Sequence, residues 1–162
     1  MKLIVDASSL INLTKAGALA IVLSLEGFTF GIGPLVENEC GPDDPELNAA
    51  IADGLIARLD DDAISANAFS NLLELYDLGD GETECLAFAD SDAQFVICSD
   101  DGAARTVAAS LFGADRVVGS LFLLRECVRK LLLTSEQARA LYEVMRNMGG
   151  FLPDLAADYF AT

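Results

Sequence analysis

The stretch that decides the fold is the first one, residues 1–17, with the sequence MKLIVDASSLINLTKAG. It begins with an apolar run at residues 3–5, which stops at the carboxylate of Asp6, and a helix-like segment with Ser8 near its start follows. A short apolar run that ends at an acid before a helix is typical of a buried parallel strand. Ligands bind beyond the carboxyl ends of such strands, so Asp6 is a candidate site residue. The alternative is that Asp6 only caps the helix, because Asp is a favoured N-cap residue.

Strand and helix patterns alternate along the rest of the chain. Apolar runs predict further strands at residues 28–32, 56–59, 95–98 and 116–118. Helical patterns occupy residues 16–25, 34–40, 46–55, 67–78, 82–89, 102–112, 121–132, 134–148 and 153–160. This alternation predicts an α/β fold, a three-layer α/β/α sandwich with a central, mainly parallel sheet. The length of 162 residues indicates a single domain over residues 1–162, which ends in a helical extension at 133–162.

Composition narrows the chemistry that the chain can perform. It contains no histidine, and its four cysteines, Cys40, Cys85, Cys98 and Cys127, have no C-x-x-C spacing. A zinc site is therefore disfavoured, the cysteines are expected to be free buried thiols, and catalysis by Ser-His-Asp or Cys-His groups is excluded. The longest uncharged apolar segment near the N-terminus, residues 16–25, is too short to span a membrane, and Asp6 interrupts any signal-peptide core, so we expect a cytoplasmic protein.

The chain is strongly acidic. It has 26 Asp and Glu residues against 10 Lys and Arg, for a net charge of −16. This charge repels nucleic acid unless basic residues cluster or cations intervene. It fits either an ordinary solvated acidic surface, with Asp60, Asp61 and Asp62 in an exposed turn, or adaptation to high salt.

Several acids are expected to meet at one edge of the sheet. The strands that end at Val5 and Cys98 run into acids, and two helices carry more, which gives the set Asp6, Glu37, Glu39, Glu82, Glu84, Asp100 and Asp101. Carboxylates gathered without basic partners repel one another, and a hard cation such as Mg²⁺ or Mn²⁺ relieves that repulsion. Such a site can activate water for phosphodiester hydrolysis. The alternative is that acids at helix N-termini only answer the helix dipole.

Five segments in order resemble the motifs of PIN domains, more narrowly of the PIN ribonucleases related to toxin–antitoxin systems. Residues 5–17, VDASSLINLTKAG, are similar to V-x-D-x-S-x-L-I-x-L-x-K-x-G, and residues 34–40, PLVENEC, to P-x-V-x-x-E-L. Residues 78–87, LGDGETECLA, resemble L-G-x-G-E-x-E-A-I-A. Residues 97–105, ICSDDGAAR, resemble L-x-[ST]-D-D-x-x-A-R, and residues 118–121 resemble V-x-G-[ST]. The resemblance covers about residues 1–132.

The resemblance implies metal-dependent cleavage of RNA. The family's catalytic and metal-binding acids map to Asp6, Glu39, Glu84 and Asp101, which would hold Mg²⁺ or Mn²⁺. Glu84 is preferred to Glu82 because Cys85, Leu86 and Ala87 follow it as in the family's acid-A-x-A pattern. The further assignments are Ser8 as a hydroxyl that orients Asp6, Glu82 and Asp100 as alternative ligands, and Arg105 as a phosphate contact or a surface ion pair.

The resemblance also implies partners. These are an RNA substrate, an antitoxin protein that covers the acidic site if the chain is a toxin, and a second copy in a homodimer. The apolar segments 16–25 and 151–160 are the candidate surfaces. A non-catalytic PIN-like binding module is the alternative function. A haloacid-dehalogenase-like phosphatase is disfavoured because position 8 is Ser rather than Asp and no motif lysine follows, and a receiver domain because it lacks the required lysine.

Overall fold

The computed structural model describes residues 1–41 and 43–161 and contains a five-stranded, all-parallel sheet. Its strands are β1 (Lys2–Val5), β2 (Thr29–Ile32), β3 (Ile56–Arg58), β4 (Phe95–Cys98) and β5 (Val117–Val118). They lie in the order β3-β2-β1-β4-β5. The predicted parallel α/β architecture is confirmed.

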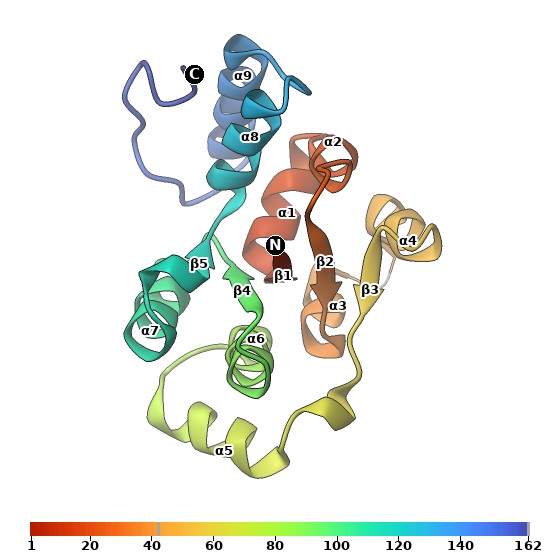
Figure 1. Cartoon of the computed structure of the whole chain (residues 1–162), viewed down its shortest axis with the longest axis vertical. Helices are drawn as coiled ribbons and strands as arrows, with labels where there is room; N and C mark the ends of the chain where they lie inside the picture. Colours follow the sequence, from red (N-terminus) through yellow and green to blue (C-terminus); the bar gives the residue numbers. More distant parts are fainter. Residues whose placement is uncertain (42, 162) are drawn as a thin grey trace.

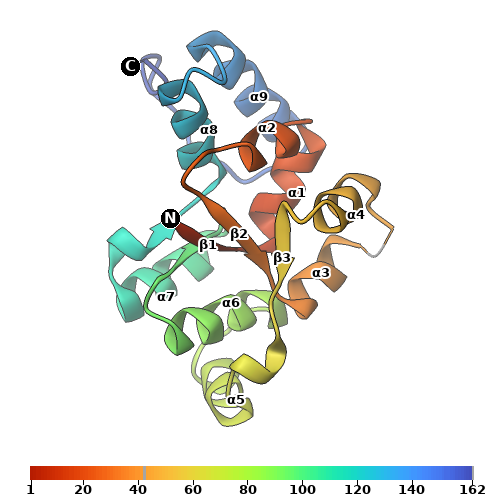
Figure 2. The same cartoon turned by 45° about the vertical axis from the view of Figure 1, so that its right-hand side comes forward.

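Helices cover both faces of this sheet. They are α1 (Ala7–Lys15), α2 (Leu19–Leu23), α3 (Pro34–Cys40), α4 (Pro45–Ala52), α5 (Ala66–Leu75), α6 (Asp80–Ser91), α7 (Gly102–Phe112), α8 (Ser120–Arg129) and α9 (Ser135–Asn147), with 3₁₀ turns η1 (Asp61–Ala63) and η2 (Ala114–Arg116). Figures 1 and 2 show α1, α2, α8 and α9 on one side of the sheet and α5, α6 and α7 on the other.

The strand order reverses between β1 and β4. From β1 the chain moves to β2 and β3 on one side, and from β4 it moves to β5 on the other. Val5 pairs with Cys98 across this junction, and the Asp6 amide donates to the Cys98 carbonyl at 2.9 Å. Asp6 and Ser99 therefore leave neighbouring strands at the same carboxyl edge, where ligands bind in open α/β sheets.

Burial on both faces explains the apolar strand runs. Leu3 and Ile4 of β1 are fully buried, and Ile97 of β4 has an exposed fraction of 1%. A parallel sheet with helices on both faces requires such continuous apolar runs. Cys85, Cys98 and Cys127 are buried free thiols and Cys40 is half-buried and free, as predicted.

The helix predicted at residues 16–25 is shorter in the structure. Gly17 adopts φ +65° directly after α1, and only residues 19–23 form α2. Leu19, Val22 and Leu23 are buried, and α2 packs against α8. These apolar side chains belong to the core, so they do not form an exposed surface for a partner.

The helix predicted at residues 153–160 is absent, whereas the helix predicted at residues 134–148 is present as α9 and begins with a capping box at Thr134. Side chains of α9 take up the carbonyls of the final segment instead. Tyr142 donates its hydroxyl to the Pro153 carbonyl at 2.8 Å, and Ser135 donates to the Phe160 carbonyl at 2.7 Å. The C-terminal extension is thus one helix followed by an irregular strap.

Candidate metal centre at the carboxyl edge of the sheet

Asp6 is a buried carboxylate with one satisfied oxygen and one unsatisfied oxygen. Its Oδ2 accepts hydrogen bonds from the Ser8 hydroxyl, from the Ser99 hydroxyl at 2.8 Å and from the Ser8 amide at 3.3 Å. Its Oδ1 is buried and has no hydrogen-bond partner among residues 1–41 and 43–161. Burial raises the pKa of Asp6, and the hydrogen bonds from Ser8 and Ser99 oppose that rise. Asp6 therefore caps α1 with Oδ2, while its Oδ1 is left without a partner.

Asp101 follows the neighbouring strand and begins α7. Its side chain accepts from the Ala104 amide at 2.8 Å, which makes it the N-cap of that helix. The Asp101 amide in turn donates to the Ser99 hydroxyl at 3.1 Å. Ser99 thus links Asp6 and Asp101. We did not single out Ser99 in the sequence, although the Ser/Thr position of the fourth motif marks it.

Asp100, the alternative ligand to Asp101, is fully engaged elsewhere. It accepts from the Asn12 side-chain amide at 2.8 Å and from the Ser120 amide at 2.8 Å and hydroxyl at 2.6 Å. Asn12 lies on α1 and Ser120 begins α8, so Asp100 ties two helices to the end of β4. Its geometry favours a structural role.

Glu39 and Glu82 come from two facing helices. Glu39 lies exposed on α3, and its Oε1 accepts from the Gly81 amide at the start of α6 at 2.9 Å. Glu82 accepts from the Gly79 amide at 2.9 Å. Burial raises the pKa of Glu82, and the negative charges of Asp101, Asp6 and Glu39 raise it further. Glu82 therefore shares the electrostatic field of the other three acids.

Glu84 faces a different direction from Glu82. It is buried, and its oxygens accept from the Leu35 and Val36 amides at 3.1 Å, at the start of α3. Burial raises the pKa of Glu84 and these two amides oppose the rise, while Glu39 and Asp61 are the charges that act on it. Its carboxylate is occupied by main-chain donors.

Arg105 binds main-chain carbonyls rather than forming the surface ion pair considered as the alternative, and its expected phosphate contact stays a prediction. Its Nη1 donates to the carbonyl oxygens of Ser99 at 2.8 Å and Val118 at 2.6 Å, at the ends of β4 and β5. Both acceptors are main-chain atoms, so the observed contacts hold the sheet edge together.

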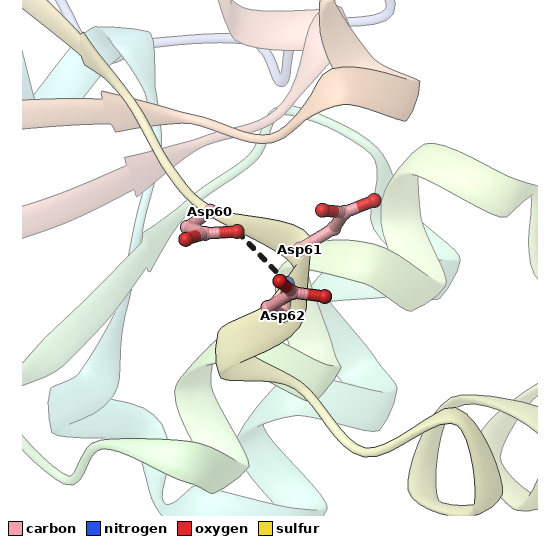
Figure 3. A group of neighbouring side chains, drawn as sticks. All are labelled: Asp60, Asp61 and Asp62. Carbon is pink, nitrogen blue, oxygen red and sulfur yellow. Dashed lines mark hydrogen bonds between the residues drawn. The ribbon is translucent and has the colours of Figure 1, made fainter.

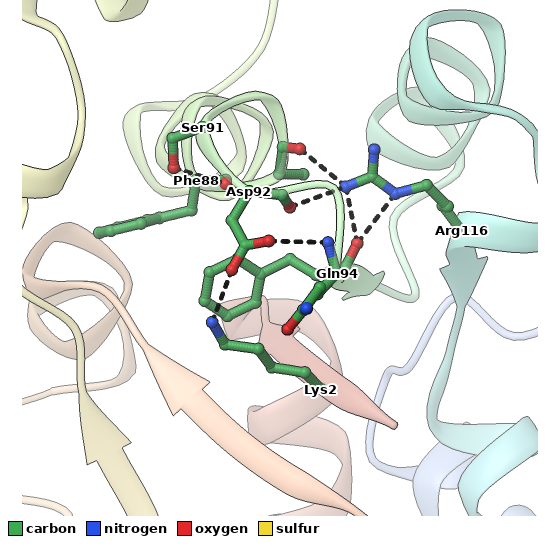
Figure 4. A network of polar contacts seen from close by, with 8 residues as sticks. Lys2, Phe88, Ser91, Asp92, Gln94 and Arg116 are labelled. Carbon is green, nitrogen blue, oxygen red and sulfur yellow. Dashed lines mark hydrogen bonds and ion pairs between the residues drawn. The ribbon is translucent and has the colours of Figure 1, made fainter.

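Other basic residues are also engaged by the protein. Lys2 pairs with Asp92 at 2.8 Å, and Arg116 donates to the carbonyls of Ala89, Asp92 and Phe95 (Figure 4). These contacts join the start of β1, the end of α6 and the region of β5. They leave few cations to hold a nucleic-acid backbone.

A second group of acids lies on the surface after β3. Oxygens of Asp60, Asp61 and Asp62 lie within 4.8 Å of one another, and all three residues are exposed (Figure 3). Asp60 accepts from the Asp62 amide at 3.1 Å and so caps η1. The acids around Asp6 do not form so tight a group. The sequence predicts a solvated turn for this surface group, and its exposed side chains in a capped 3₁₀ turn agree with that prediction.

The parallel sheet with acids at its strand-order switch is an open α/β fold of the kind that binds ligands at this edge. The chain belongs to the PIN domain family, because the model of the PIN domain family DUF3368 matches residues 2–158. No curated protein and no solved structure gave a significant match. PIN domains are typically nucleases that use divalent metal ions. No helix among the described residues is long and apolar enough to cross a membrane.

We expect Arg105→Ala to lower stability rather than to weaken phosphate contacts. The change removes two charge-assisted hydrogen bonds to main-chain carbonyls and should cost about 1–3 kcal/mol in the free energy of unfolding. Denaturant titration measures this loss. The salt dependence of RNA binding should stay unchanged, whereas loss of a phosphate contact would reduce the slope of log K against log salt by about 1.

Proposed function

We propose that this protein is a metal-dependent ribonuclease, which hydrolyses phosphodiester bonds in RNA, with Asp6, Glu39, Glu82 and Asp101 as its metal ligands. The observation that carries the proposal is the unsatisfied Oδ1 of the buried Asp6 carboxylate. A buried, unpaired charge is costly unless a cation or a proton neutralises it. Glu39, Glu82 and Asp101 bring further negative charge to this edge, so a cation is the fitting partner.

The donor set fits a hard divalent cation. All four proposed ligands are carboxylates, and oxygen ligands suit Mg²⁺ and Mn²⁺ rather than zinc or copper. Glu82 takes the place that the sequence pattern assigned to Glu84. The reason is that Asp6, Glu39 and Asp101 all act on the pKa of Glu82, while the oxygens of Glu84 accept from the amides of α3.

The chain's own groups have defined tasks in such a site. The bound cation would lower the pKa of water and offset the charge that develops on the phosphate. Ser8 and Ser99 hold Asp6 in one orientation by donating to its Oδ2. Glu82, which lies in the field of the other three acids, is the candidate group to orient the attacking water and accept its proton.

The affinity of the protein for RNA should depend on the bound cation. The net charge of −16 and the internal engagement of Lys2, Arg105 and Arg116 leave the protein with little basic surface. We therefore propose that RNA binds weakly without Mg²⁺ or Mn²⁺ and is held near the acids when the cation is present.

A role as the toxin of a toxin–antitoxin pair is the finer form of this proposal. It requires an antitoxin segment that covers the acidic edge, and homodimers are the expected assembly. A largely apolar pocket of about 630 Å³ adjoins that edge, beside Asp100 and Arg105, and Leu121, Phe122 and Phe151 contribute to its walls. The Phe151 side chain is 97% exposed, so this pocket is the candidate entry for a partner segment.

Cleavage of a single-stranded RNA oligonucleotide with Mg²⁺, with Mn²⁺ and with a chelator tests the function. We expect activity only with a metal, and a loss of about 10²–10⁴-fold in Glu82→Gln, because the change removes both a ligand and the candidate proton acceptor. Asp62→Asn, in the exposed acid group, is the matched control and should cleave as the wild type does. RNA that stays intact with both metals would favour a non-catalytic binding module.

A further inference from the structure

In two facing helices, α3 and α6, a carboxylate from each helix accepts hydrogen bonds from main-chain amides at the start of the other. Glu84 of α6 accepts from the amides of Leu35 and Val36 at the start of α3, at 3.1 Å. Glu39 of α3 accepts from the amide of Gly81 at the start of α6, at 2.9 Å. Each helix thus supplies an acid for the amides that the other leaves without an intrahelical partner.

These reciprocal contacts leave little space for a side chain at Gly33 and Gly81. A Cβ added at Gly33 would lie 2.2 Å from Glu84 Oε2, and one added at Gly81 would lie 2.8 Å from both oxygens of Glu39. The two side chains differ in how freely they can move away, because Glu84 is only 1% exposed whereas Glu39 is exposed. Glu84 is the fixed member of the pair.

Glu84 is held by α3 more firmly than the proposed ligands are held by their own amide donors, since Glu39, Glu82 and Asp101 each accept from one amide. Both of its oxygens accept from main-chain amides, and turning the carboxylate away would leave the Leu35 and Val36 amides without their observed acceptor. An unpaired buried donor costs about 1–3 kcal/mol. Main-chain anchoring therefore competes with metal binding for this carboxylate, and the geometry favours anchoring.

We propose that Glu84 is a positioning residue, which fixes the start of α3 against α6 and so sets Glu39 and Glu82 at their places in the metal centre. The proposal rests on the proposed function, in which these two acids bind the metal. The anchored amides lie about one helical turn before Glu39, and Glu84 lies two residues after Glu82. One buried contact therefore controls the relative position of two ligands that different helices carry.

Three variants separate anchoring from ligation: Glu84→Gln, Glu84→Ala and Glu82→Gln. Calorimetric titration with Mn²⁺ gives the metal affinity of each folded protein, and hydrogen exchange reports on the Leu35 and Val36 amides. Glu84→Gln keeps an acceptor oxygen, so we expect its Mn²⁺ affinity to stay within about threefold of the wild type. Glu84→Ala should bind about 10–100-fold more weakly, as expected when a group that orients ligands is lost, and its two amides should exchange faster. Glu82→Gln should lose binding without faster exchange.

The outcomes that overturn the proposal are distinct from those that overturn the function. If Glu84→Gln loses Mn²⁺ binding as completely as Glu82→Gln, with protected Leu35 and Val36 amides, Glu84 is a ligand and the proposal fails. If the wild type binds no Mn²⁺, the proposed function fails. The anchoring role of Glu84 is then tested by hydrogen exchange alone, and unchanged exchange of the Leu35 and Val36 amides in Glu84→Ala overturns it. Glu84→Gln keeps the test decisive should Glu84→Ala not fold.

Discussion

Asp6→Asn is expected to abolish metal-dependent RNA cleavage and, at the same time, to make the metal-free protein more stable at neutral pH. The loss of activity follows because the change removes the buried charge with the unsatisfied oxygen, and it should amount to about 10²–10³-fold or more. The gain in stability follows because the wild type holds a desolvated carboxylate among Glu39, Glu82 and Asp101. A gain of about 1 kcal/mol corresponds to a rise in Tm of about 2–4 °C for a chain of this length.

The pH dependence of this gain has a definite sign. Burial raises the pKa of Asp6 above its ordinary value of 3.8, so the folded state binds a proton more readily than the unfolded state does. The stability of the wild type then falls as pH rises from 3.8 through the raised pKa, and asparagine escapes this fall. The advantage of Asp6→Asn should therefore be present at neutral pH and vanish below pH 3.8.

Thermal unfolding across pH in the presence of a chelator measures this difference. Asp62→Asn serves as the control because it removes an equal charge from an exposed position. A variant that is less stable than the wild type at neutral pH would mean that Asp6 acts only as the N-cap of α1. The dual role proposed for it would then be wrong.

Gly33→Ala is expected to have the largest effect on stability. The backbone of Gly33, at φ −84° and ψ 161°, is open to any residue, so the effect is steric. The added Cβ would meet Glu84 Oε2 at 2.2 Å and displace a buried carboxylate from two amides. We expect a cost of about 2–4 kcal/mol in the free energy of unfolding.

A double-mutant cycle shows whether this contact is the cause. Glu84→Ala removes the atoms with which the new methyl group collides, so the two changes together should cost less than the sum of their separate costs, by about 1 kcal/mol or more. Gly102→Ala is the matched control: a Cβ there meets nothing within 4 Å, and it begins α7. If Gly33→Ala is as mild as Gly102→Ala, the anchoring contact is not as tight as the structure has it.

The parts of the account that could be predicted from the sequence are those that depend on local pattern. Apolar runs ending in acids gave the strand ends at Val5 and Cys98, and parallel strands bring their carboxyl ends to one edge. Asp6 and Asp101 could be named because each directly follows, or nearly follows, a strand. The α/β fold followed from the alternation of strand and helix patterns.

The parts that could not be predicted depend on how helices are rotated and paired. Glu82 and Glu84 lie two positions apart, about 200° around the helix, so only the packing of α6 decides which one faces Asp6. Asp100 finds its partner in Ser120, far along the chain, and nothing local indicates that pairing. The irregular strap after α9 is likewise set by side chains such as Tyr142, which bind its carbonyls.

The measurement that tests the central claim most directly is a Mn²⁺ titration of three proteins. These are the wild type, Asp6→Asn, and a variant with Asp60, Asp61 and Asp62 all changed to Asn. The account predicts saturable binding of equal affinity in the wild type and the triple variant, and loss of that binding in Asp6→Asn. Binding that survives in Asp6→Asn but disappears in the triple variant would contradict it and move the metal centre to the exposed turn after β3.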